Sequence, residues 1–180
     1  MGKDFFHVSV SMDPRHFHIA SIAEPGAALS AAMACALQWL QQRDAHELAL
    51  ALPDKDQLSG MLTGVLGADA ARSLDRDNAY VRKGITLFLL TPKIQRRRMP
   101  GPVVAFGLEP DQLENVIAAQ GVTDVIYVPG SSAPEDFATY LTRYPRSEAL
   151  AQQGALDWVQ DAPLRAAVNE RSLAPPASPA

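Results

Sequence analysis

Cysteine is nearly absent from this chain, because Cys35 is the only one among 180 residues. A single cysteine excludes an intramolecular disulfide and any metal site built from several cysteines. Long apolar runs are missing too: no stretch approaches the ~18 apolar residues that span a bilayer. Residues 1–7 (MGKDFFH) lack the apolar core of a signal peptide. We therefore expect a cytoplasmic protein with no membrane-spanning segment.

Motifs of the common enzyme and nucleotide-binding families are also missing. Gly60, Gly64 and Gly67 have a spacing that fits neither a dinucleotide-binding loop nor a P-loop. There is no Gly-x-Ser-x-Gly motif, and Cys35 falls in an alanine-rich segment, where a thiol packs as a small hydrophobe. The sequence thus predicts no cofactor, and it leaves open whether the chain is an enzyme.

The charge balance is slightly acidic, with a net charge of −4. The molecule as a whole therefore has no attraction for nucleic acids or anionic membranes, and we do not expect either as a partner. Hydrophobic residues make up 47% of the chain and charged residues 20%, which is typical of a globular domain. A chain of this length suits one domain with a sizeable core.

Short apolar runs alternate with helical patterns through most of the chain. Strands are predicted at 47–52, 85–90, 102–108 and 124–128, and helices at 27–42, 111–120 and 135–143. Such runs are typical of parallel strands that are covered on both faces. We predict a three-layer α/β fold with helices on both faces of a mainly parallel or mixed sheet of about five to six strands. The short link between the strands at 85–90 and 102–108 leaves an antiparallel pairing of these two open.

The two ends of the chain depart from this pattern. Residues 4–22 alternate apolar and polar side chains around a turn at 12–15, which predicts an N-terminal β-hairpin. Residues 151–172 predict a helical extension, and the low-complexity residues 173–180 a disordered tail. The predicted organisation is therefore a single α/β domain at 1–150, followed by these two segments.

Polar residues follow the predicted strands at their carboxyl ends. In a doubly wound sheet ligands bind beyond these ends, where helix N-termini present amides to anions. Aspartate is also favoured as a helix cap, and capping is the interpretation that we favour for Asp54, Asp56 and Asp111. The candidate ligand-binding residues at these ends are Asp54, Lys55, Asp56, Thr91, Lys93, Glu109, Ser131 and Ser132.

Three histidines, His7, His16 and His18, share the polar face of the predicted hairpin. Neutral imidazoles bind zinc or nickel, but no cysteine stands beside these three, and the nearest carboxylates are Asp4 and Asp13. A solvated polar face explains the alternation without a metal, so we predict no metal site.

Basic residues are concentrated between positions 82 and 98, where the sequence has no acidic residue. Such a cluster can bind phosphate groups or a nucleic-acid backbone. Few aromatic residues flank it, which favours a solvated loop, or a contact with the acidic remainder of a second subunit, over single-strand binding. The cluster comprises Arg82, Lys83, Lys93, Arg96, Arg97 and Arg98.

These patterns favour a non-enzymatic binding or regulatory protein that recognises a protein partner or a small anionic ligand. One alternative is a small enzyme acting on a nucleotide-like or phosphorylated substrate through Asp54, Lys55, Asp56 and Lys93. Another is a nucleic-acid-binding subunit that uses the basic loop. The small residues almost all round helix 27–42 fit packing against the sheet or against a second copy, so a homo-oligomer is a further hypothesis.

Overall fold

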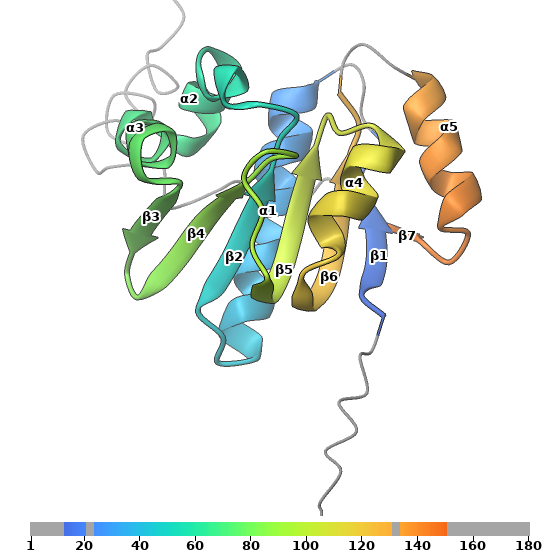
Figure 1. Ribbon diagram of the computed structural model, residues 1–180, viewed down its shortest axis with the longest axis horizontal. Helices are drawn as coiled ribbons and strands as arrows, with labels where there is room; N and C mark the ends of the chain where they lie inside the picture. The colour runs from blue at the N-terminus through green and yellow to red at the C-terminus, as the bar shows by residue number, and fades with distance from the viewer. Residues whose placement is uncertain (1–12, 21–23, 131–133, 151–180) are drawn as a thin grey trace, which may run out of the picture.

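The computed structural model describes residues 13–20, 24–130 and 134–150. These residues form one seven-stranded sheet in the order β3-β4-β2-β5-β6-β1-β7 (Figure 1). All neighbouring strands are parallel except β3 and β4. The strands are β1 (Arg15–His18), β2 (Glu47–Ala51), β3 (Ala79–Arg82), β4 (Ile85–Leu90), β5 (Arg98–Phe106), β6 (Gln120–Val128) and β7 (Glu148–Ala149).

Helices cover both faces of the sheet, so the predicted three-layer α/β class is confirmed. One face carries α1 (Pro25–Gln42), α2 (Met61–Leu66) and α3 (Ala68–Asp77). The short 3-10 helix η1 (Lys55–Leu58) precedes α2 in the chain. The other face carries α4 (Pro110–Ile117) and α5 (Pro134–Arg143). Within the described residues, no helix is long and apolar enough to cross a membrane.

The alternation of side chains along each strand builds two separate cores. In β2, Leu48 and Leu50 face the core under α1, whereas Ala49 and Ala51 face the core on the side of α4 and α5. Both sets are fully buried, which explains why the central strands read as continuous apolar runs. The two strands that the sequence did not predict are the short β3 and β7, which carry no such run.

Consecutive strands β4 and β5 are not neighbours, because β2 lies between them and is parallel to both. The antiparallel alternative for β4 and β5 is therefore wrong. Their connection, residues 91–97, crosses the face of the sheet without a helix. The connection leads into β5, which passes very close to β2 at Gly101. A Cβ atom at Gly101 would overlap the carbonyl oxygen of Glu47. Only glycine allows this approach.

The small residues of α1 pack against the sheet. Ala28, Ala32 and Ala36 are fully buried in the same core as Leu48 and Leu50, and Cys35 is half-buried at its margin. This packing accounts for the composition of the helix without a second copy of the chain.

The first arm of the predicted hairpin, residues 5–11, lies outside the described residues, as do 151–172 and 173–180. The second arm is β1, which has β6 on one side and β7 on the other, both parallel to it. Phe17 and Ile19 point into the core under α1, whereas His16 and His18 contact rings of α5 on the opposite face.

Candidate functional site

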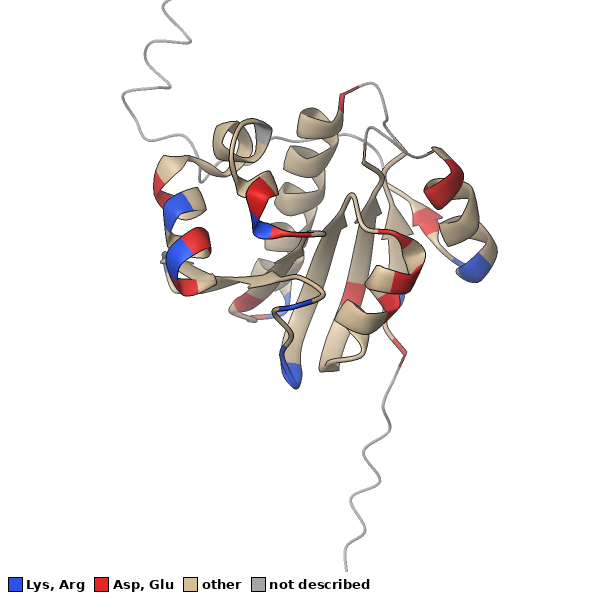
Figure 2. Cartoon of the chain, turned by 45° about the horizontal axis from the view of Figure 1, so that its top comes forward, with Lys and Arg blue, Asp and Glu red and all other residues tan. Residues whose placement is uncertain are grey.

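One half of the sheet face that carries α4 and α5 has no helix over it. The two helices lie over the half that contains β5, β6 and β1, whereas the connection 91–97 runs over β4 and β2 (Figures 1 and 2). We call the surface formed by this connection and the adjacent side of β3 and β4 the open face. Its side chains, with Arg98 at its rim, are Glu47, Ala79, Val81, Thr86, Phe88, Arg96, Arg97 and Arg98.

Apolar side chains of β3 and β4 contribute to the open face. Ala79 is paired with Phe88 and Val81 with Thr86, so these four side chains point to the same side of the sheet. Val81 is 66% exposed and is the one large hydrophobic side chain that the described residues leave exposed. The guanidinium of Arg96 lies 3.7 Å from the centroid of the Phe88 ring, in cation–π contact.

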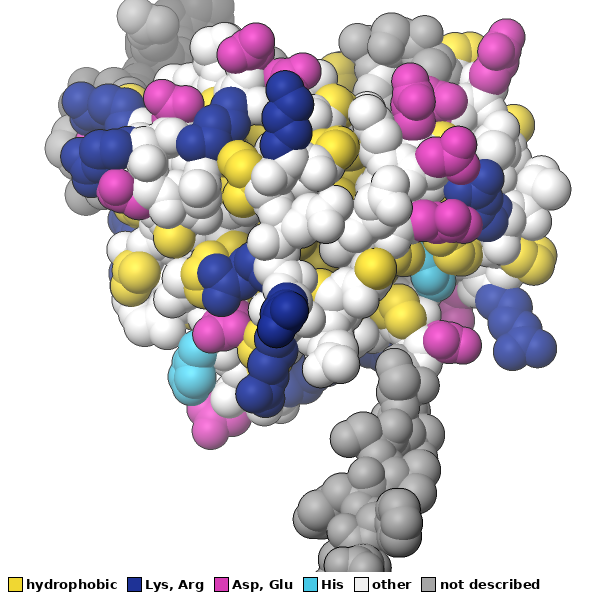
Figure 3. Space-filling view, viewed as in Figure 1, with side chains coloured by type: hydrophobic (Ala, Val, Ile, Leu, Met, Phe, Trp, Pro, Cys, Tyr) yellow, Lys and Arg dark blue, Asp and Glu magenta, His cyan; other side chains and the backbone are white. Residues whose placement is uncertain are grey.

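Unpaired positive charge lies beside these apolar groups. Arg97 and Arg98 are exposed, and neither forms an ion pair with a carboxylate of the described residues. Figure 3 shows basic side chains gathered next to hydrophobic ones on this part of the surface, and acidic side chains over α4 and α5. The open face is therefore a local basic and apolar surface on a protein of net charge −4.

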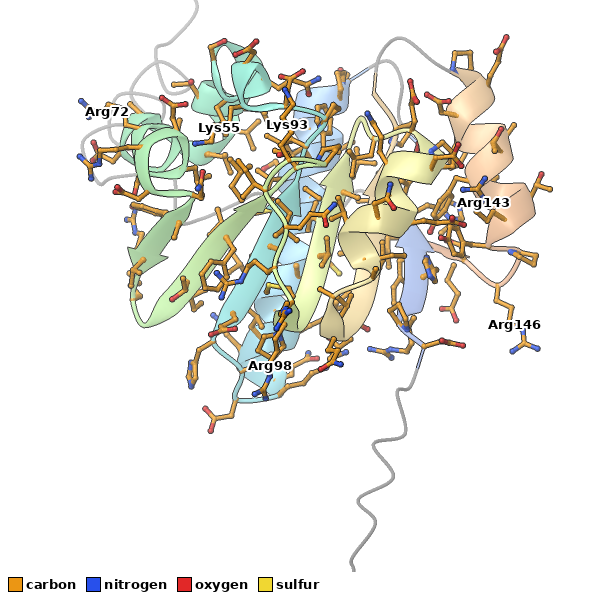
Figure 4. All side chains as sticks on the ribbon, in the orientation of Figure 1. Lys55, Arg72, Lys93, Arg98, Arg143 and Arg146 are labelled. Atoms are coloured by element: carbon orange, nitrogen blue, oxygen red, sulfur yellow. The ribbon has the colours of Figure 1, made fainter. Side chains whose placement is uncertain are left out.

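The structure divides the basic cluster that the sequence predicted. Arg82 and Lys83 form the turn between β3 and β4 and line a groove of about 530 Å³ with α1, on the opposite face. Lys93 lies at the carboxyl end of β4, far along the connection from Arg98 (Figure 4). Of the six, Arg96, Arg97 and Arg98 remain together.

Three of the predicted ligand-binding residues stabilise local turns. Asp54 Oδ1 accepts the backbone N–H of Asp56 at 3.0 Å and caps η1. The buried Thr91 Oγ1 accepts the backbone N–H groups of Lys93 and Ile94 at 3.2 and 3.0 Å. Glu109 forms a capping box at the start of α4. Sequence reasoning favoured capping for Asp54, Asp56 and Asp111, and this hydrogen bond confirms it for Asp54. For the other two the prediction is wrong, because Asp56 and Asp111 lie in the first turns of η1 and α4, whose caps are Asp54 and Glu109.

Lys55 and Asp56 line a groove of about 540 Å³ between η1, α2 and α3, together with Arg72. Its cations already have partners: Lys55 Nζ donates to the carbonyl oxygen of Asp75, and Arg72 pairs with Asp69. Lys55 and Lys93 lie at the same end of the sheet (Figure 4). Ser131 and Ser132 lie outside the described residues.

The two described histidines of the predicted hairpin are half-buried under α5 rather than solvated. The ring of His16 stacks on Tyr144 with 3.9 Å between centroids. His18 Nδ1 lies 2.8 Å from the hydroxyl of Ser147, which is 2.9 Å from that of Tyr140. Burial lowers the pKa of His16, against a smaller opposing effect of the Asp13 charge, and burial lowers the pKa of His18.

This histidine network joins β1, α5 and the segment before β7, and it forms one wall of a groove of about 890 Å³ lined by His16 and Ser147. Across the described part of the chain, no group of three or more His, Cys, Asp or Glu side chains could hold a metal ion. His7 lies outside the described residues. The network packs the sheet edge against α5.

A buried ion-pair cluster in the middle of β6 was missed by sequence reasoning. Asp124 is fully buried, and it bonds Arg15 and Arg43, whose guanidinium groups both lie over the ring of Trp39. Burial alone would raise the pKa of Asp124, but hydrogen bonds from Arg43, Thr123 and Arg15 outweigh it and lower the pKa. The strand sequence DVIYV gives no sign of these distant partners.

No protein-family model, curated protein or solved structure matches this chain. The function is therefore inferred from the geometry of the chain itself.

Proposed function

We propose that this protein is a binding module that recognises an acidic protein partner through the open face. The observation that carries the proposal is the pair of exposed guanidinium groups of Arg97 and Arg98, which have no carboxylate partner among the described residues and directly follow Arg96, whose guanidinium contacts the Phe88 ring. Arginine and apolar side chains that adjoin in this way are enriched at protein interfaces.

A protein partner fits the open face better than a nucleic acid does. Single-strand binding needs aromatic rings on which bases stack. The ring of Phe88 is half-buried and already covered by Arg96, and Tyr80 packs on the core under α1. The net charge of −4 also opposes general attraction to a polyanion.

The competing proposal is a small anionic ligand or phosphorylated substrate at the carboxyl ends of the strands. It rests on Lys55, Asp56 and Lys93. It has less support, because Lys55 and the neighbouring Arg72 already bond groups of the protein, whereas the side chains of Arg97 and Arg98 bond none of the described residues. Titration with inorganic phosphate that shifted the amide resonances of residues 55–75 would favour this competitor.

The test compares two double charge reversals of equal size. Arg97→Glu with Arg98→Glu alters the open face, and Arg82→Glu with Lys83→Glu alters the groove on the opposite face. Exposed ion pairs contribute about 0.2–1 kcal/mol each, so losing two and introducing repulsion should weaken binding of poly-L-glutamate by roughly tenfold or more. The control pair should retain wild-type affinity.

Two results would overturn the proposal. Equal loss in both double variants would show that net charge, rather than the open face, governs binding. Tighter binding of a single-stranded oligonucleotide than of poly-L-glutamate, at equal salt and abolished by Arg97→Glu with Arg98→Glu, would assign the face to nucleic acid instead.

A further inference from the structure

Strand β3 ends the sheet on the side of the open face. The backbone N–H of Leu89 donates to the carbonyl oxygen of Asn78 at 2.9 Å, so the polar backbone groups of Asn78 point toward β4. In an antiparallel pair this direction alternates with every residue. The backbone groups of Tyr80 therefore also point toward β4, and those of Ala79 and Val81 point away from the sheet. The carbonyl oxygen of Ala79 already accepts a hydrogen bond from the Ser73 hydroxyl at 2.6 Å, which leaves the Ala79 N–H and both backbone groups of Val81 for a partner.

The side chains of Ala79 and Val81 extend the open face to the outer edge of β3. Ala79 and Val81 lie on the side of Phe88 and Arg96. A strand added beside β3 would lie about 4.8 Å away. Every second side chain of that strand would then stand over the open face, beside the exposed Val81 and within the field of Arg96.

We propose that the acidic partner binds as an extended segment that adds a strand to the outer edge of β3. This inference rests on the proposed function. The Ala79 N–H and both backbone groups of Val81 supply the main-chain hydrogen bonds. The side chain of Val81 contacts an apolar or β-branched side chain, and acidic side chains lie toward Arg96. Strand addition obtains affinity from the main chain and specificity from alternate side chains in this way.

Charge complementarity selects this occupant over a second copy of the chain. Two β3 strands paired with each other would bring two copies of the same basic face next to each other, and like charges repel. A segment that carries carboxylates turns the same charges into attraction. An edge strand that has no strand partner on its outer side among the described residues is otherwise a liability that proteins protect.

Val81→Pro tests the main-chain contribution. The N–H of Val81 points away from β4, so proline removes an outward donor and no hydrogen bond of the β3–β4 ladder, as it does on natural edge strands. Val81→Thr is the matched control, because it keeps both the donor and the β-branched shape. The probe is a short peptide of alternating glutamate and valine. We expect Val81→Pro to weaken its binding roughly tenfold or more, and Val81→Thr to change it by less than about threefold.

Hydrogen exchange of wild-type protein gives a second measurement that does not depend on a variant. The Val81 amide should exchange fast in the free protein and become protected when the peptide is added. Protection in the free protein would mean that the edge is already covered, and would overturn the inference.

If Val81→Pro binds like wild type while Arg97→Glu with Arg98→Glu does not, strand addition fails and the proposed function stands. If neither variant loses affinity, the proposed function fails.

Discussion

The close approach of β5 to β2 predicts that Gly101→Ala strongly destabilises the protein. A Cβ atom at this buried position would lie 3.2 Å from the carbonyl carbon of Glu47 and would overlap its oxygen. Both atoms belong to the backbone of a central strand, so no side-chain rotation relieves the overlap. The strands must instead separate in the middle of the sheet, where Ala49 and Val103 are paired.

Overpacking a core costs about 1–3 kcal/mol, and a backbone overlap belongs at the upper end. We expect a loss of about 3 kcal/mol of unfolding free energy, which lowers Tm by roughly 6–12 °C for a domain of this size. Gly64→Ala is the control, because Gly64 lies in α2 with no atom within 4 Å of its added Cβ. That change should leave stability unchanged or raise it by up to about 1 kcal/mol.

The assay is urea unfolding of both variants, followed by circular dichroism, with a thermal melt as a check. If Gly101→Ala unfolds at the same urea concentration as wild type, β5 does not pass this close to β2. The connection 91–97 would then not lie across the sheet as described, and the open face built on it would lose its basis.

Two further predictions concern buried ionisable groups. Asp124→Ala should cost about 2 kcal/mol, below the value for a fully buried pair because the side chain of Arg15 is 60% exposed and can rehydrate. The pKa of Asp124 is held below its ordinary 3.8. The difference in unfolding free energy between wild type and Asp124→Ala should therefore be complete above pH 3.8 and shrink as the pH falls through the lowered pKa. A difference that stays constant with pH would contradict the pairing. The lowered pKa values of His16 and His18 mean that the unfolded chain takes up protons first, so unfolding free energy should fall as pH drops below 6.5 toward the folded values. His18→Gln should reduce this slope in urea titrations at a series of pH values, and an unchanged slope would mean that His18 is not buried as described.

The sequence predicted the layers of this fold better than its edges. The run from Ile85 to Leu90 matches β4, because a strand buried on both faces must be apolar throughout. β5 begins four residues before the predicted Pro102, and β6 begins at Gln120 rather than Asp124, because the amino ends of both strands carry exposed or charged residues. Periodicity gives no signal there.

The candidate site depends on topology that local patterns do not contain. The sequence places Arg82 and Arg96 in one basic cluster, but they lie on opposite faces. Arg82 is paired with Ile85 and faces α1, whereas the connection that carries Arg96 crosses the other face of the sheet. Likewise, the burial of Asp124 follows from partners in β1 and α1, far away in the sequence. Neither the strand order nor these long-range pairs can be inferred from the spacing of residues.

The open face itself is tested most directly by mapping amide chemical shifts of wild-type protein during titration with the peptide of alternating glutamate and valine. The account predicts that the largest shifts fall on residues 79–83, 86–88 and 94–98, and that they weaken as salt is added. Shifts centred on residues 55–75, or on α4 and α5, with residues 79–98 unchanged, would contradict it.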